Sequence, residues 1–213
     1  MKKLNIELKP ILVSIGLVGF QSILYTLSGL LNGDLHLIGN SIDDKIPFVI
    51  WFIIPYCLWY LMLFVVPYYI YKKDKTKFTK YCISYILITI VANIVFIAYP
   101  TTVARPNVTG NNPIDLLTRF IFWIDNPPQN CFPSLHCGVS ALWLLYIISL
   151  KDCNKYFRVF TVIMSLLIMA ATMFIKQHVF IDFVAGDIIA IVIVIVISYE
   201  NKLTNKIKNI LKI

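Results

Sequence analysis

Long apolar stretches alternate with short polar segments along most of the chain. Six stretches have a length of roughly 17 to 25 residues, which is what an α-helix needs to cross the hydrocarbon core of a membrane. They cover residues 11–31, 47–71, 81–99, 134–150, 158–175 and 182–199. The pattern therefore predicts an all-α fold, an integral membrane bundle of six transmembrane helices that forms a single domain over residues 1–213.

The first stretch resembles a signal peptide only in its position. Lys2, Lys3 and Lys9 precede an apolar run that is too long for a signal-peptide core, and no small-residue cleavage site follows it. We expect it to be the first spanning helix. Residues 112–124 have the pattern of a helix that lies in the membrane surface, with Asn111 or Asn112 before Pro113 as its start.

The composition agrees with a membrane protein. Hydrophobic residues make up 59% of the chain and charged residues only 14%, whereas soluble domains contain about 25% charged residues. The net charge of +8 comes from clusters next to the predicted spans, where lysines face anionic lipid headgroups. Membrane lipids are the expected partners; nucleic acid is not, and the sequence indicates no protein partner.

The distribution of basic residues predicts the orientation of the helices. Fifteen of the 19 basic residues lie in four segments, namely the N-terminus, residues 71–80, residues 151–158 and the residues after 199. Because short cytoplasmic loops retain lysine and arginine, both termini are expected in the cytoplasm. The chain shows no organelle-targeting segment, so we expect the plasma membrane of a bacterium.

The unusual polar residues fall on the opposite, outer side of the predicted bundle. They are Arg105 after the third span, Ser134 and His136 at the start of the fourth, and Lys176, His178 and Asp182 between the fifth and the sixth. No cluster of thiolates or carboxylates indicates a metal site, and no cofactor is expected. These residues together predict a phosphate site that contains a nucleophile and an acid.

His178 and Asp182 are four residues apart, so they share one face if the last helix begins near Lys176. A carboxylate on one imidazole nitrogen fixes the tautomer and leaves the other nitrogen free to attack. The alternative is a solvated histidine and an aspartate that is favoured by the helix dipole. The spacing alone leaves both interpretations open.

The segment "PSLH" predicts the start of a helix. Ser134 is suited to cap it, and the capped end presents backbone N–H groups to an anion, with His136 above them in the first turn. A helix cap without any ligand explains Ser134 equally well, but it explains His136 poorly. Arg105 supplies a permanent charge suited to bidentate phosphate binding.

Three motifs, in order and spacing, resemble the signatures of the phosphatidic acid phosphatase type 2 superfamily. They are "RP" at 105–106, "PSLH" at 133–136 and "HVFID" at 178–182. The six-span layout is also similar. The forms "CFPSLHCG" and "KQHVFIDFVAG" are most similar to the branch that includes inositolphosphorylceramide-synthase-like enzymes.

The resemblance implies metal-independent phosphoryl transfer through a phosphohistidine. His178 is then the nucleophile, Asp182 orients it, and His136 protonates the leaving oxygen. Arg105 and Ser134 hold phosphate oxygens. A neutral imidazole suits this role because it does not repel the phosphate, while cationic donors stabilise the charge on the equatorial oxygens.

The chain departs from the family pattern at two cation positions. Ala98 stands where the first motif usually has lysine, and Ala171 and Thr172 stand where the third usually has serine and arginine. Lys176 either replaces one of these cations or is an interfacial lysine that reaches toward the headgroups.

Three functions follow as hypotheses. The first is a lipid phosphatase that hydrolyses a lipid phosphate or pyrophosphate, such as phosphatidate or a polyprenyl diphosphate, outside the cytoplasm. The second is a phosphotransferase that gives a phosphoryl or phospho-head group to an alcohol instead of water. The third, motivated by Ala98 and Thr172, is an inactive protein that binds lipid phosphates.

Overall fold

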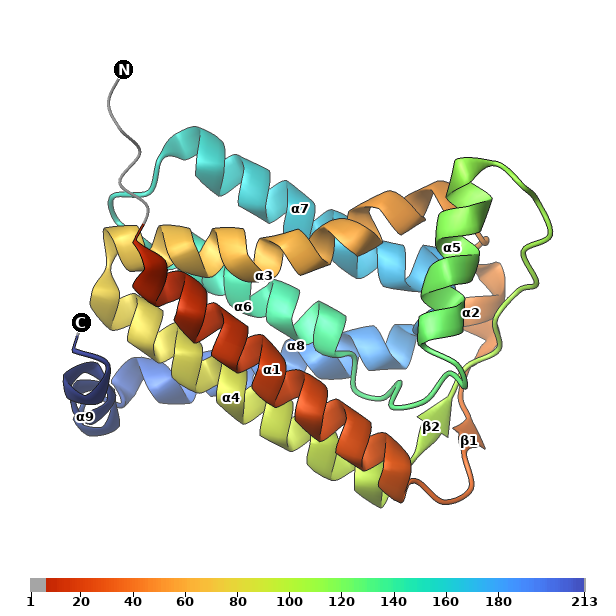
Figure 1. The fold of residues 1–213 in the computed structure, drawn as a ribbon, viewed down its shortest axis with the longest axis horizontal. Helices are drawn as coiled ribbons and strands as arrows, with labels where there is room; N and C mark the ends of the chain where they lie inside the picture. Colours follow the sequence, from red (N-terminus) through yellow and green to blue (C-terminus); the bar gives the residue numbers. More distant parts are fainter. Residues whose placement is uncertain (1–6, 213) are drawn as a thin grey trace.

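The fold is a bundle of long helices (Figure 1), and the computed structural model describes residues 7–212 of it. The long helices are α1 (Leu8–Leu31), α3 (Ile53–Lys73), α4 (Lys75–Ala98), α6 (Leu135–Ser149), α7 (Lys155–Phe174) and α8 (Phe180–Tyr199). Shorter helices are α2 (Ser41–Lys45), α5 (Pro113–Ile124) and α9 (Lys202–Leu211), and a 3-10 turn (Ile50–Phe52) precedes α3. Two short parallel strands, β1 (His36–Leu37) and β2 (Thr101–Thr102), pair His36 with Thr101.

Each apolar stretch predicted from the sequence falls on one long helix, and most ends agree within a few residues. The clearest differences are at two starts: α3 begins at Ile53, after the 3-10 turn, rather than at residue 47, and α4 begins at Lys75 rather than at residue 81. The segment 75–80 is rich in lysine, which is a good helix former. Asp74 caps it, because its side chain accepts a hydrogen bond from the backbone N–H of Lys77 at 2.9 Å.

Within residues 7–212, five helices are long and apolar enough to cross a membrane: α1, α3 together with its 3-10 turn, α4, α7 and α8. The remaining apolar helix, α6, has 15 residues. Its length is therefore about 22 Å, less than the hydrocarbon core of about 30 Å. The helix predicted over residues 112–124 is confirmed as α5, with Asn112 as its N-cap and Pro113 as its first residue; its position in the membrane surface stays a prediction.

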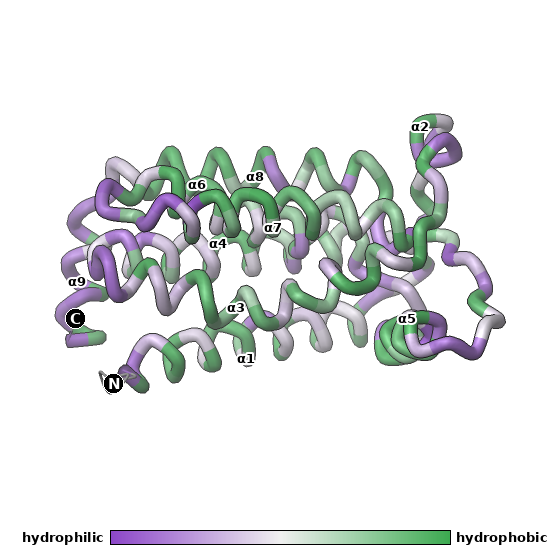
Figure 2. The backbone as a smooth tube through the Cα atoms, turned by 90° about the horizontal axis from the view of Figure 1, so that it is seen from above, coloured by the Kyte–Doolittle hydropathy of each residue, from purple (hydrophilic) through white to green (hydrophobic). Residues whose placement is uncertain are grey.

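Helix α6 forms the centre of the bundle. It packs against α3, α4, α7 and α8, and Leu142 and Trp143 are fully buried. The indole of Trp143 donates a hydrogen bond to the Tyr81 hydroxyl at 3.1 Å, so this polar group has a partner inside the bundle. The outer helices expose aliphatic side chains, and Figure 2 shows their apolar character along the bundle.

The two ends of the bundle differ in character. The α3–α4 and α6–α7 connections lie at the same end as α9 and the start of α1, while α2, α5 and the strands lie at the other end (Figure 1). Lysines connect the first group: Lys80 Nζ donates to the Ser198 carbonyl at 2.7 Å and Lys208 Nζ to the Thr76 hydroxyl at 3.0 Å. The basic segments from residue 71 onward thus gather at one end. Lys2 and Lys3 lie outside the described residues.

The first turns of α6 and α8 approach each other closely at the opposite end. The backbone N–H of Ser134 donates to the Asp182 carbonyl at 3.1 Å. Gly138 and Gly186 face each other here: a Cβ added to Gly138 would lie 3.0 Å from the Gly186 carbonyl oxygen, and one added to Gly186 would overlap the Ser134 carbonyl. Two glycines therefore allow the backbones to touch.

We predict that Gly186→Ala destabilises the protein, because the new methyl group must push apart the first turns of α6 and α8. Overpacking of this kind costs about 1–3 kcal/mol and should lower the thermal unfolding midpoint in detergent by roughly 2–10 °C. Gly19→Ala in α1 is the control, since no atom lies within 4 Å of its added Cβ. Equal midpoints for the two variants would contradict the predicted contact.

Candidate active site

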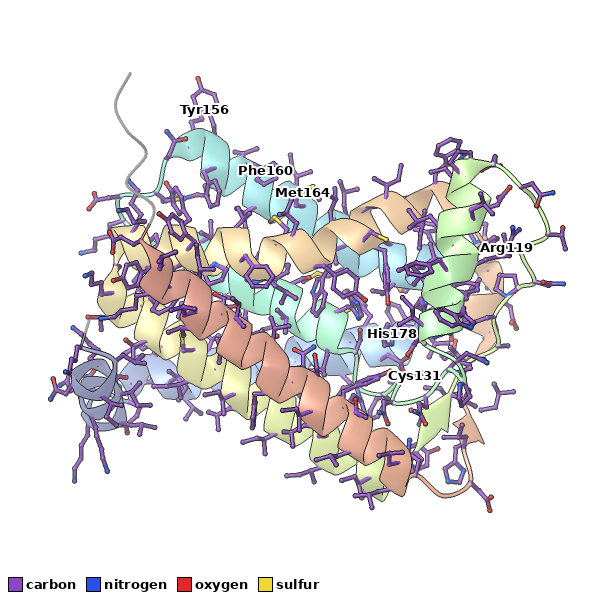
Figure 3. All side chains as sticks on the ribbon, viewed as in Figure 1. Arg119, Cys131, Tyr156, Phe160, Met164 and His178 are labelled. Carbon is purple, nitrogen blue, oxygen red and sulfur yellow. The ribbon has the colours of Figure 1, made fainter. Side chains whose placement is uncertain are left out.

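A cavity of about 360 Å³ opens at the end of the bundle that carries α5. Its walls come from α1, α3, α4, α5, the segment before α6, the first turn of α6, and residues 177–178. Figure 3 shows His178 and Cys131 at this end, and both line the cavity. The site thus combines segments from most of the chain, far apart in sequence.

His178 and Asp182 are in contact, although not in the way the sequence predicted. Helix α8 begins at Phe180, so His178 precedes it rather than sharing a helical face with Asp182. Asp182 instead lies in the first turn, where its Oδ2 accepts from the Val179 N–H at 3.1 Å and lies 3.2 Å from His178 Nδ1. Because a carboxylate only accepts, Nδ1 carries the proton and Nε2 is unprotonated in the neutral ring.

Asp182 is fully buried, and its position is fixed by these two donors. No hydrogen-bond partner for Nε2 of His178 exists within residues 7–212, and the ring lines the cavity. The imidazole therefore presents an available lone pair to a molecule in the cavity.

His136 lies across from His178, with 5.9 Å between the ring centroids. Its ring stacks on Tyr56 at 4.6 Å and lies 4.2 Å from the Trp59 ring. Both aromatic residues are buried, which holds the imidazole in place. The sequence analysis assigned no role to Tyr56 and Trp59, although their three-residue spacing in an aromatic-rich helix was an available signal.

Ser134 is the N-cap of α6, as the sequence predicted. Its Oγ accepts a hydrogen bond from the Cys137 N–H at 3.3 Å. The hydroxyl proton is not used in that bond and can be donated to an anion. Its contact with a phosphate stays a prediction.

Arg105 lies beside the cavity, behind two of its lining residues. Nη1 donates to the Asp125 carbonyl at 2.7 Å, and Nη2 contacts the carboxylate of Asp125 and the side-chain oxygen of Gln177. The Phe122 ring lies 5.1 Å from the guanidinium carbon. Sequence reasoning missed Asp125 and Gln177, although one is a carboxylate in the outer loop before "PSLH" and the other immediately precedes His178.

The structure does not bring Lys176 to the cavity. Its Nζ donates to the carbonyls of Asp43 at 2.9 Å and Ile46 at 2.5 Å, which belong to α2 and its C-cap. Its backbone has a φ of 56°, in the left-handed region. Lys176 thus anchors the loop before His178.

The two positions at which the superfamily signatures usually have a cation carry no charged side chain in this protein. Ala98 is exposed at the end of α4, and Thr172 is buried with its hydroxyl donating to the Met169 carbonyl at 2.7 Å. Within residues 7–212, groups of three or more histidine, cysteine, aspartate or glutamate side chains that could hold a metal ion are absent. Arg105 instead lies beside the cavity, where it contacts the lining residues Asp125 and Gln177.

The sequence model of the PAP2 superfamily matches residues 24–196, a range that includes Arg105, both histidines and Asp182. The chain belongs to the PAP2 superfamily. Members of the PAP2 superfamily are generally phosphatases, so membership indicates phosphatase-type activity. No curated protein and no solved structure matches the chain.

Asp43 in α2 fixes the start of α8 from outside. Its Oδ1 accepts from the Phe180 N–H at 2.7 Å, and its Oδ2 accepts from the Asn40 N–H at 2.9 Å. The carboxylate thereby caps one helix while it closes the capping box of another. No local pattern around residue 180 pointed to this distant contact.

We predict that Asp43→Ala lowers stability by about 0.5–2 kcal/mol, as expected for a lost helix cap, and reduces phosphatase turnover because His178 loses its fixed position. Asp43→Asn keeps an acceptor oxygen and should retain most of the activity. Asp44→Ala is the matched control, since Asp44 is exposed. Thermal unfolding measures the loss of stability, and phosphate release measures the loss of turnover. Full activity of Asp43→Ala would rule out that Asp43 holds His178 in position.

Proposed function

We propose that this member of the PAP2 superfamily is a lipid phosphatase that transfers the phosphoryl group of its substrate to Nε2 of His178. The single observation that carries the proposal is the bond between His178 and Asp182, at 3.2 Å, beside a cavity that also contains His136. Asp182 stabilises the positive charge that develops on the imidazole during attack. The nucleophile stays neutral until it meets the phosphate.

His136 acts as the general acid and then as the general base. The lone pair of His178 Nε2 forms a bond to phosphorus, the bond from phosphorus to the ester oxygen breaks, and protonated His136 gives its proton to that oxygen. His136 then takes a proton from water, whose oxygen attacks phosphorus and releases inorganic phosphate from His178. The separation of 5.9 Å between the rings supports this assignment, since a phosphoryl group fits between them.

Arg105 and the hydroxyl of Ser134 bind phosphate oxygens in this proposal, and Lys176 is left out because its ammonium is held by α2. Positive donors stabilise the charge that spreads over the equatorial oxygens of the transition state. No metal ion is required by these steps.

The substrate is a lipid phosphate or pyrophosphate that reaches the cavity from the membrane. Helix α5 supports this proposal, because it exposes Leu116, Phe120 and Trp123 and its C-terminal end lines the cavity. Such a helix suits the membrane surface, with its apolar side chains among the acyl chains. The phosphate can then enter the cavity while the chains of the lipid stay in hydrocarbon.

We further propose that all six apolar helices cross the membrane within one domain and that both termini are cytoplasmic. The gathering of the basic segments at the end opposite the cavity supports this orientation. The short helix α6 is surrounded by α3, α4, α7 and α8, so its length need not match the lipid. The cavity then opens on the outer side of a plasma membrane, which we propose to be bacterial.

A phosphotransferase is the second candidate, with the inositolphosphorylceramide-synthase-like branch as the nearest resemblance. The observation that favours it is the neutral wall of the cavity, where Gln21, Thr26 and Gln129 offer hydrogen bonds to an alcohol. The same histidines serve both reactions. Added alcohols should yield a new phosphoester with the transferase, whereas a hydrolase yields inorganic phosphate and the dephosphorylated lipid.

We predict that purified protein releases phosphate in the presence of excess chelator from phosphatidate, phosphatidylglycerol phosphate or a polyprenyl diphosphate, and that His178→Ala lowers turnover by at least about 1,000-fold, because the attacking nitrogen is removed. His36→Ala is the matched control, since His36 stacks on Tyr99 away from the cavity. Substantial activity in His178→Ala would refute the assigned nucleophile. Absence of turnover and transfer with every lipid would favour the inactive binding protein.

A further inference from the structure

Asp125 occupies a position in the cavity that the proposed reaction does not use. It is the C-cap of α5, and its Oδ1 accepts a hydrogen bond from the Tyr25 hydroxyl of α1 at 2.9 Å. Its other carboxylate oxygen pairs with Arg105, whose second terminal nitrogen donates to the Asp125 carbonyl at 2.7 Å. One residue therefore engages both terminal nitrogens of the guanidinium.

This arrangement conflicts with phosphate binding as the site stands. The carboxylate lines the same cavity as His136 and His178, and a phosphate near these rings would be repelled by it. Both terminal nitrogens of Arg105 are also occupied by Asp125, Nη2 by its carboxylate and Nη1 by its carbonyl. The side chain of Arg105 is only 9% exposed, so the competition takes place in a poorly solvated environment where charge matters most.

A second cavity of about 220 Å³ adjoins the first and offers space for the carboxylate of Asp125. Asp125 and Tyr25 line both cavities. The second is bounded by residues 126, 127 and 129 and by α1, and neither His136 nor His178 lines it. A rotation of the Asp125 side chain toward this cavity would withdraw the carboxylate from Nη2 of Arg105, while Nη1 stays bound to the Asp125 carbonyl and Nη2 to the Gln177 oxygen.

We propose that Asp125 is an internal substitute for the phosphate of the substrate. Its carboxylate holds Arg105 in the empty site, and the incoming phosphate displaces it toward the second cavity. This inference rests on the proposed function, because it assumes that Arg105 binds a phosphate oxygen. Asp125 is then a positioning residue that acts through Arg105: it keeps the buried guanidinium paired, weakens the binding of every phosphate group, and accelerates product release.

The substitution Asp125→Asn separates this role from a structural one. Asparagine has the same shape and can accept from Tyr25, but it competes for Arg105 without a charge. Binding of inorganic phosphate should tighten by roughly tenfold, and the KM for the lipid phosphate should fall by a similar factor without a rise in kcat. Asp34→Asn, in an exposed loop, is the control for the change in net charge.

The experiment measures equilibrium binding of radiolabelled inorganic phosphate to the full-length protein in detergent, beside steady-state kinetics. The tighter binding of Asp125→Asn should disappear when Arg105→Ala is added. Unchanged, weaker or undetectable phosphate binding by Asp125→Asn, or a gain that persists with Arg105→Ala, would overturn the proposal. If Asp125→Asn binds phosphate more tightly only when Arg105 is present, but the protein turns over no lipid, the displacement of Asp125 stands and the proposed phosphatase activity is refuted. The failure of this inference and the failure of the proposed function therefore give different results.

Discussion

The contact between the first turns of α6 and α8 is the constraint on which the site depends. The N–H of Ser134 donates to the carbonyl of Asp182, and Gly138 and Gly186 remove the side chains that would separate the two backbones. His136 lies on one of these helices, and the carboxylate that orients His178 lies on the other. The distance between the two imidazoles is therefore set by helix packing. Within residues 7–212, the only loop that affects this distance is the short segment before α8, which carries His178. Side-chain and backbone contacts with α2 hold that segment in place.

Charge around the cavity is balanced residue by residue. His178 faces Asp182, Arg105 faces Asp125, and the ammonium of Lys176 is satisfied by backbone carbonyls of the α2 segment. Such pairing is needed because an isolated charge is costly in a poorly solvated interior. In our proposal the same balance selects the reaction: a phosphate that enters must replace Asp125 at Arg105, and it meets a nucleophile without negative charge. In the same proposal, the absence of charge at Ala98 and Thr172 leaves this one guanidinium with an unusually large share of phosphate binding.

The sequence predicted the helices well because length and hydropathy are local properties. The surface helix after Asn112 and the cap at Ser134 were also readable, since each is defined by a few neighbouring residues. The arrangement of the site was harder to predict from the sequence. The shared helical face of His178 and Asp182 required a helix start near Lys176, whereas α8 begins at Phe180. The role of Lys176 could not be foreseen because its partners are in α2, far away in sequence. Asp125, Gln177, Tyr56 and Trp59 were missed for the same reason, since their contacts with Arg105 and His136 exist only after distant segments have packed together.

The most direct test of the central claim is to trap the covalent intermediate. The protein is mixed with a lipid carrying a radiolabelled terminal phosphate, stopped in alkali after milliseconds, and digested for mass spectrometry. A phosphohistidine is stable in alkali and labile in acid, which distinguishes it from a phosphoserine. Our account predicts label on His178 that appears before free phosphate and decays as phosphate is released. Label on His136, or steady turnover with no labelled histidine at any time, would contradict it.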